Sequence, residues 1–190
     1  MGCFEEAMLS TAPSGKIPTL YRRFIDDVFG IWLGDVESLL EFSNHANSCH
    51  PTIQFTYVYG RSVPYLDTRV SLEDCHIVTD LSAKQTNTHQ YLLPSSSYPP
   101  HVHCNFPYGL GIRVRAIVNA PDTLDRRLDE LSRFFRKRGF SASVNNHQFA
   151  KVRSKPREEV LTSRENRKRT PAEFRSSAQG IRFCRLCHTS

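Results

Sequence analysis

The chain has 190 residues, of which 39% are hydrophobic and 23% charged, and its formal net charge is +6. This length allows one domain or two small ones, and no apolar run approaches the ~20 residues of a membrane span. Neither a secretory signal nor a complete myristoylation pattern follows Met1. We therefore expect an intracellular protein, nuclear or cytoplasmic and not secreted, with reduced thiols and no membrane partner.

The charge is divided unevenly along the chain. Residues 1–112 carry a net charge of −5, and residues 113–190 carry +11. The basic half is typical of a segment that binds nucleic-acid phosphates. A solvated basic tail that binds polyanions without specificity would have the same composition.

An acidic pair, Asp26 and Asp27, interrupts two runs of aromatic and β-branched residues within residues 20–33. Such runs favour strands, so the pattern predicts a hairpin with both carboxylates at its turn. Mg²⁺ prefers one or two carboxylates together with substrate phosphates, which is the arrangement needed for two-metal nucleotidyl transfer. The alternative is an ordinary surface turn, because Asp is a common turn residue.

The residues after this hairpin predict a helix and a sheet. Asp35 is placed to cap a helix that ends at His50-Pro51. Three strand signals follow at residues 53–59, 63–72 and 76–81, and the short turns between them favour one antiparallel sheet. Residues 1–81 therefore predict a small α+β domain.

Residues 82–108 are rich in proline, serine and histidine and predict a connecting loop. His101, His103 and Cys104 lie within it, but no further ligand is placed to complete a metal site.

A helical pattern covers residues 109–155. It predicts a short helix near 110–118, a second from Pro121 that ends at Gly139, and a third capped by Ser141. This three-helix unit resembles a helix-turn-helix. A plain packing unit with a solvated basic face is the alternative. Residues 156–190 are basic and lack a sustained period, so they predict a disordered tail.

The final cysteines, Cys184 and Cys187 with His188, match the attachment pattern of c-type haem. No haem-enclosing fold accompanies them, so we expect no haem. A zinc site would need two more ligands. Their role stays open.

Several segments resemble the reverse transcriptases of Penelope-like retroelements. Residues 21–27, Tyr-Arg-Arg-Phe-Ile-Asp-Asp, are similar to the family's aromatic-X-Asp-Asp motif. Residues 63–70 resemble its Pro-Phe-Leu-Asp strand, and residues 136–140 resemble its Arg-Gly-Tyr turn. The resemblance covers residues 2 to 155 in the family's order.

The resemblance implies the palm and thumb of an RNA-directed DNA polymerase, with an RNA template, a DNA primer and Mg²⁺. Asp26 and Asp27 would be the catalytic metal ligands. Phe24 would pack beside the primer end, and Tyr65 and Leu66 lie on the strand that resembles the primer grip. The basic residues of the thumb would contact backbone phosphates: Arg113, Arg115, Arg126, Arg127, Arg133, Arg136, Lys137 and Arg138.

The chain departs from this family in one catalytic feature. The family's first catalytic aspartate lies on a strand well upstream of the Asp-Asp pair, yet only 25 residues precede the pair here and none of them is an aspartate. We therefore expect a fragment that is inactive alone, unless another chain supplies the aspartate. The alternative function is a non-catalytic, nucleic-acid-binding helix-turn-helix module.

Overall fold

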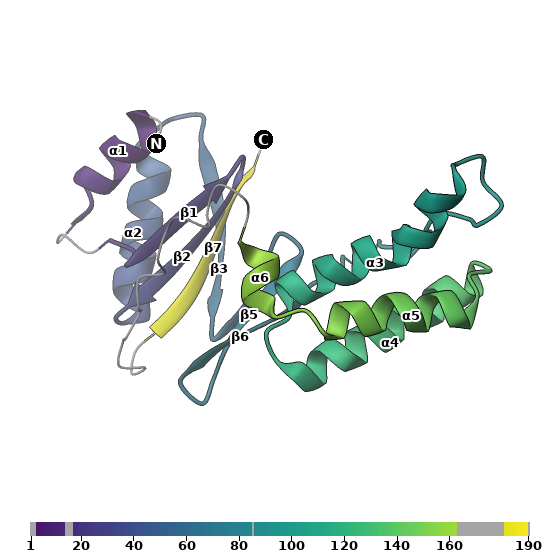
Figure 1. The fold of residues 1–190 in the computed structure, drawn as a ribbon. Coiled ribbons are helices and arrows are strands. Elements are labelled where there is room, and N and C mark those ends of the chain that lie inside the picture. Colours follow the sequence, from purple (N-terminus) through teal and green to yellow (C-terminus); the bar gives the residue numbers. More distant parts are fainter. Residues whose placement is uncertain (1–2, 14–16, 85, 163–180, 190) are drawn as a thin grey trace. The chain divides into compact units, whose positions relative to one another are not determined.

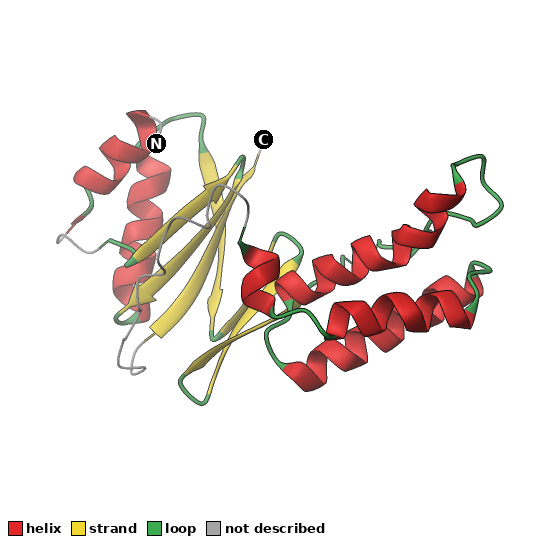
Figure 2. Cartoon of the chain, viewed as in Figure 1, coloured by secondary structure: helices red, strands yellow, loops and turns green. Residues whose placement is uncertain are grey.

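The computed structural model describes residues 3–13, 17–84, 86–162 and 181–189. It has the expected α+β class and contains two compact units (Figures 1 and 2). The first unit comprises Met1–Ile77 with Ser176–Ser190, and the second comprises Val78–Arg175. Each unit is described by itself below.

The first unit is built on a four-stranded antiparallel sheet with the order β1-β2-β7-β3. Two helices accompany it, and Figure 1 shows them on one face of the sheet. The elements are α1 (Cys3–Ser10), β1 (Leu20–Phe24), β2 (Asp27–Leu33), α2 (Val36–Ser48), β3 (Gln54–Gly60) and β7 (Ile181–Thr189).

Both faces of this sheet are packed, because β2 is apolar throughout its middle. On the helical face, Trp32 packs with residues of α1 and α2 that include Met8 and Phe42. On the other face, Phe29 and Ile31 pack with a second set of buried residues, Val63, Leu72 and Phe183. α2 begins where predicted, because the Asp35 carboxylate accepts a hydrogen bond from the Ser38 N–H at 2.9 Å.

A second, three-stranded sheet has the order β4-β5-β6 (Ser62–Tyr65, Thr68–Glu73 and His76–Leu81). Residues 63–72 were expected to form one strand paired with residues 53–59, and this prediction is wrong. The chain turns back at Leu66, whose φ is +54°, so this segment forms a hairpin. β3 belongs to the other sheet.

The described part of the second unit contains four helices, and the three longest surround one apolar core. They are α3 (Pro100–Ile117), α4 (Pro121–Lys137), α5 (Ala142–Arg153) and α6 (Arg157–Leu161). Leu128, Phe135, Phe149 and Val152 are almost completely buried in this core. The predicted break lies at Gly139, with φ +93°, and Ser141 caps α5 by accepting a hydrogen bond from the Val144 N–H.

Two ion pairs show how α4 and α5 pack. Arg153, at the end of α5, lies 2.6 Å from Asp125 and 3.1 Å from Asp129, both in the first half of α4. The two helices therefore run antiparallel, whereas a DNA-binding helix-turn-helix commonly joins its helices at about 90–120°. The unit is an antiparallel three-helix arrangement with a tight turn between α4 and α5.

Two predicted boundaries are wrong. The loop expected over residues 82–108 ends at Pro99, because α3 begins at Pro100 and includes Pro107. Proline is tolerated in the first turn of a helix, which explains why α3 can begin at Pro100. The tail expected over residues 156–190 contains α6 and the strand β7, whose Phe183 and Cys184 are buried. Residues 163–180 of that tail lie outside the described part.

Among the described helices, none combines the length and the apolar character needed to cross a bilayer.

Candidate nucleic-acid interface

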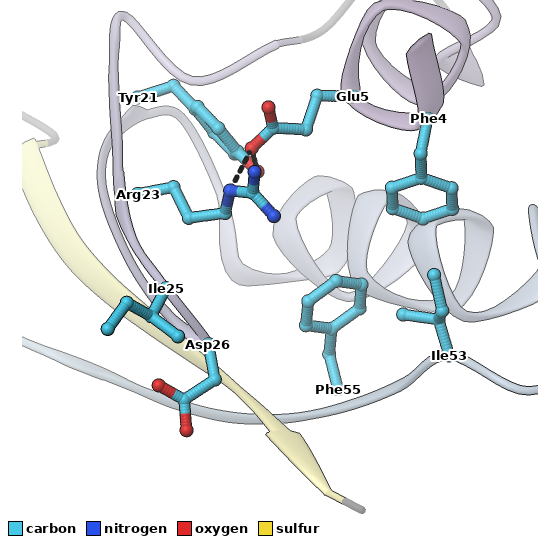
Figure 3. Close-up of a pocket in the computed structure, with 8 residues that line it drawn as sticks. All are labelled: Phe4, Glu5, Tyr21, Arg23, Ile25, Asp26, Ile53 and Phe55. Atoms are coloured by element: carbon cyan, nitrogen blue, oxygen red, sulfur yellow. Dashed lines mark hydrogen bonds and ion pairs between the residues drawn. The ribbon is translucent and has the colours of Figure 1, made fainter. Parts of the chain in front are cut away.

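The acidic hairpin forms as predicted, but its two carboxylates face different surroundings. β1 and β2 pair from Leu20↔Ile31 to Phe24↔Asp27, which leaves a two-residue turn at Ile25 and Asp26. Asp26 is exposed and lines a pocket beside α1 (Figure 3). Asp27 is half-buried and faces Arg185 of β7. The turn therefore holds one solvent-facing carboxylate and one that is already paired.

The pocket beside Asp26 has a volume of about 320 Å³ and contains a buried carboxylate, Glu5. The Tyr21 hydroxyl donates to Glu5 Oε1 at 3.2 Å, and Arg23 Nε lies 2.8 Å from the same oxygen (Figure 3). Burial raises the pKa of Tyr21 strongly, and the Glu5 charge raises it further. The apolar wall comes from Phe4 and Phe55, whose rings stack 6.3 Å apart.

The other carboxylate, Asp27, is neutralised within the sheet. Arg185 donates to Asp27 Oδ1 from Nη2 at 2.9 Å and from Nε at 3.2 Å. Burial raises the pKa of Tyr65, and the charge of Asp27 raises it further, so the phenol lies near this pair. Within the described residues, no three His, Cys, Asp or Glu side chains are grouped to hold a metal ion. A Mg²⁺ ion at Asp26 would therefore depend on phosphate and water oxygens.

The residues expected to lie near a primer are placed at two hairpin turns. Phe24 is 55% exposed at the end of β1, and Leu66 is 39% exposed at the β4–β5 turn. Tyr65 is half-buried and packs its ring against Phe29 at 5.3 Å.

Five of the eight cations expected to bind phosphates interact with other residues of the second unit. Arg127 pairs with Asp80 and Glu130, and Arg126 lies 3.7 Å from Asp80. Two others donate to backbone carbonyl oxygens, Arg115 to Lys155 and Arg138 to Tyr91. Arg113 lies close enough to Tyr91 to oppose the rise in the tyrosine pKa that burial causes.

The remaining three cations, Arg133, Arg136 and Lys137, are exposed at the end of α4. Their side chains form no hydrogen bond or ion pair with another described residue. Arg133 and Lys137 also line a hollow of about 240 Å³, together with Glu130 and Phe134. Cations in the last turn of a helix are favoured by the helix dipole, which suits Arg136 and Lys137 to this position.

Sequence reasoning missed the exposed face of α5, the helix that follows the turn. This face carries hydrogen-bonding side chains at helical spacing: Ser143, Asn146, His147 and Lys151. Their three- and four-residue spacing places them on one face of a helix, opposite the buried Phe149 and Val152, and this spacing can be read from the sequence. A charge pattern does not reveal this face, because three of its four side chains are not cationic.

The cysteine and histidine clusters assemble no site among the described side chains. Cys184 is buried against Gly30, and burial raises its thiol pKa to about 11. The side chains of Cys187 and His188 lie outside the described part. His103 contacts the Ser96 carbonyl oxygen through Nε2 at 3.1 Å.

Comparison with known families identifies one segment. The family model for the animal helix-turn-helix domain matches residues 90–150, which include α3, α4 and most of α5. This match supports the helix-turn-helix module expected near residues 109–155 and extends it toward the N-terminus. No curated protein and no solved structure matches the chain.

Proposed function

We propose that this chain binds nucleic acid, and that the end of α4 contacts the phosphate backbone through Arg133, Arg136 and Lys137. The observation that carries the proposal is that these three cations are exposed, with no side-chain partner among the described residues, inside the segment that matches the helix-turn-helix family. Phosphate contacts from Arg and Lys supply most non-specific affinity for nucleic acid.

The turn after these cations adds a second kind of contact. In helix-turn-helix proteins the helix after the turn presents its N-terminal residues to base edges. Here the helix after the turn is α5, which runs antiparallel to α4, and its exposed Asn146 and His147 lie one to two turns from its start. The cations of α4 would fix the position on the backbone, and these side chains would meet the bases.

Fluorescence anisotropy of the full chain with labelled oligonucleotides tests the proposal. Replacing Arg133, Arg136 and Lys137 by Gln should lower affinity about tenfold or more. The triple variant neutralises fewer phosphates, so its binding releases fewer counterions. The slope of log affinity against log salt should fall by about 2 to 3. The matched control replaces Arg61, Arg69 and Lys84, three exposed cations outside the interface, by Gln. An equal loss in both triple variants would reject the assigned interface.

We also propose that the first unit derives from the palm of a reverse transcriptase of the Penelope-like type. The supporting observation is the two-residue turn that holds Asp26 at the exposed apex with Asp27 directly after it. In the intact enzyme these aspartates would hold Mg²⁺ for nucleotidyl transfer on an RNA template and DNA primer. The Arg185 pair on Asp27 argues against catalysis by this chain alone.

Two measurements test this second proposal. Primer extension with the chain, Mg²⁺, template and deoxynucleotides should give no product that depends on Asp26. Paramagnetic Mn²⁺ should broaden the amide signals of the hairpin turn, and Asp26→Asn should remove the broadening. Absence of any broadening near the turn in the unaltered chain would reject the metal-binding role.

A further inference from the structure

The hollow at the end of α4 has an aromatic wall that is held in place by its neighbours. Phe134 is half-buried, and His89 stacks on it with ring centroids 4.0 Å apart and planes 10° from parallel. His89 Nδ1 lies 3.3 Å from the Tyr91 hydroxyl. Arg138 Nε donates to the Tyr91 carbonyl oxygen at 3.0 Å, which ties this short segment to α4. The Phe134 ring is therefore pre-organised where it lines the hollow.

The rim of the hollow carries two cations and one carboxylate, and these groups differ in whether another described residue already binds them. Arg133 and Lys137 are exposed and bind no described residue. Glu130 Oε2 accepts a hydrogen bond from Arg127 Nη1 at 2.8 Å, whereas its Oε1 bonds to no described residue. The rim thus offers two cations for an anion and one carboxylate oxygen for a hydrogen-bond donor.

From this combination we infer that the hollow binds one unpaired nucleobase that carries an exocyclic amino group, with the flanking phosphates on Arg133 and Lys137. An aromatic wall stacks a base whatever its sequence. The two cations suit phosphate oxygens. A glutamate oxygen accepts from an amino group, as Glu and Asp do from cytosine N4. This inference rests on the phosphate contacts of the proposed function, not on its base contacts from α5, and adds that single strands are preferred to duplexes.

The preference follows from access to the base. In a duplex both faces of each base are stacked on neighbouring bases, so the Phe134 ring cannot reach them. In a single strand both are open. Thymine lacks an exocyclic amino group, so it would stack without the hydrogen bond to Glu130.

The experiment is a set of anisotropy titrations of the full chain with 15-nucleotide dC and dT single strands and a mixed-sequence duplex. We expect dC to bind at least about fivefold more tightly than dT, since a good base-edge contact discriminates by this factor or more. Both single strands should bind more tightly than the duplex. Equal binding of dC, dT and duplex would overturn the inference.

Three variants assign the effects to residues. Phe134→Leu should weaken single-strand binding about tenfold, as expected for loss of one base–aromatic stack, and leave duplex binding unchanged. Phe134→Tyr keeps the ring and should retain single-strand binding, so a fold defect in the leucine variant is distinguished from loss of stacking. Glu130→Gln offers both a donor and an acceptor, and it should abolish the difference between dC and dT.

Failure of this inference is distinguishable from failure of the proposed function. If salt-dependent binding persists but Phe134→Leu changes nothing, the phosphate interface stands and the base-binding hollow is rejected. If the unaltered chain binds none of the oligonucleotides, both are rejected.

Discussion

Arg127 donates a hydrogen bond to each carboxylate oxygen of Asp80, from Nε to Oδ1 at 2.9 Å and from Nη2 to Oδ2 at 2.7 Å. The two residues lie 47 positions apart in the sequence, and the pair joins the end of β6 to α4. Two parallel hydrogen bonds between a guanidinium and a carboxylate form the strongest geometry of ion pair. Arg127 is therefore a structural residue of the second unit, although its sequence context suggested a phosphate contact.

Breaking this pair should destabilise the second unit. Asp80→Asn should lower its free energy of unfolding by about 1–2 kcal/mol, less than for a fully buried pair because both side chains keep some exposure. Urea denaturation followed by helical circular dichroism measures the change. Arg126→Gln is the control, because Arg126 lies 3.7 Å from Asp80 and is 59% exposed, so its loss should have little effect. Equal effects of the two variants would contradict the prediction.

The same pair should make the stability of the second unit depend on pH. Burial alone would raise the Asp80 pKa, but hydrogen bonds from Arg127 and the Leu81 N–H, with the charges of Arg127 and Arg126, outweigh it and lower the pKa. A lowered folded-state pKa gives stability that is present above the unfolded pKa of about 4 and is lost as pH falls. Urea titrations between pH 6 and pH 3 should show this loss, and Asp80→Asn should reduce it. An unchanged pH dependence in that variant would exclude Asp80 as the source.

A glycine at the hairpin turn should stabilise the first unit. Ile25 has φ +56° and is 75% exposed, and a β-branched residue is strained in the left-handed region. Ile25→Gly should therefore raise the free energy of unfolding by about 0.5–1 kcal/mol. The chain's single tryptophan, Trp32, is buried in this unit, so its fluorescence reports the transition. Asp26→Gly is the control and should give no gain, since the φ of Asp26 is not positive.

Replacing a buried amide of α5 by an apolar side chain should stabilise the second unit. Asn145 is fully buried, and neither its Oδ1 nor its Nδ2 finds a partner among the described residues. An unpaired buried polar group costs about 1–3 kcal/mol, so Asn145→Leu should raise the melting temperature. Gln148→Leu is the matched control on the same helix. Gln148 Nε2 donates to the Cys104 carbonyl oxygen at 2.9 Å, so its loss should lower the melting temperature.

The elements predicted correctly are those whose signals are local. Asp35, Gly139 and Ser141 mark helix ends through their own backbone and side-chain chemistry, and the Asp26 turn is marked by the strands that flank it. β7 was missed because its sequence is basic and its partners lie far away, as the 158 positions between Asp27 and Arg185 show. For the same reason the sequence could not separate the paired cations of the expected interface from the exposed ones. Charge alone could not tell that Arg127 would meet Asp80 whereas Arg133 would stay exposed.

The place of β7 between β2 and β3 determines when the first sheet can be completed during protein synthesis. The ribosome delivers β7 after the whole second unit, so β2 and β3 emerge long before the strand that lies between them. Until then each has an unpaired edge, which is a template for mispairing with other chains. A premature stop codon after α6 would leave helices α3 to α6 but remove an inner strand of the sheet. Nascent chains of this protein should therefore depend on chaperones until translation ends.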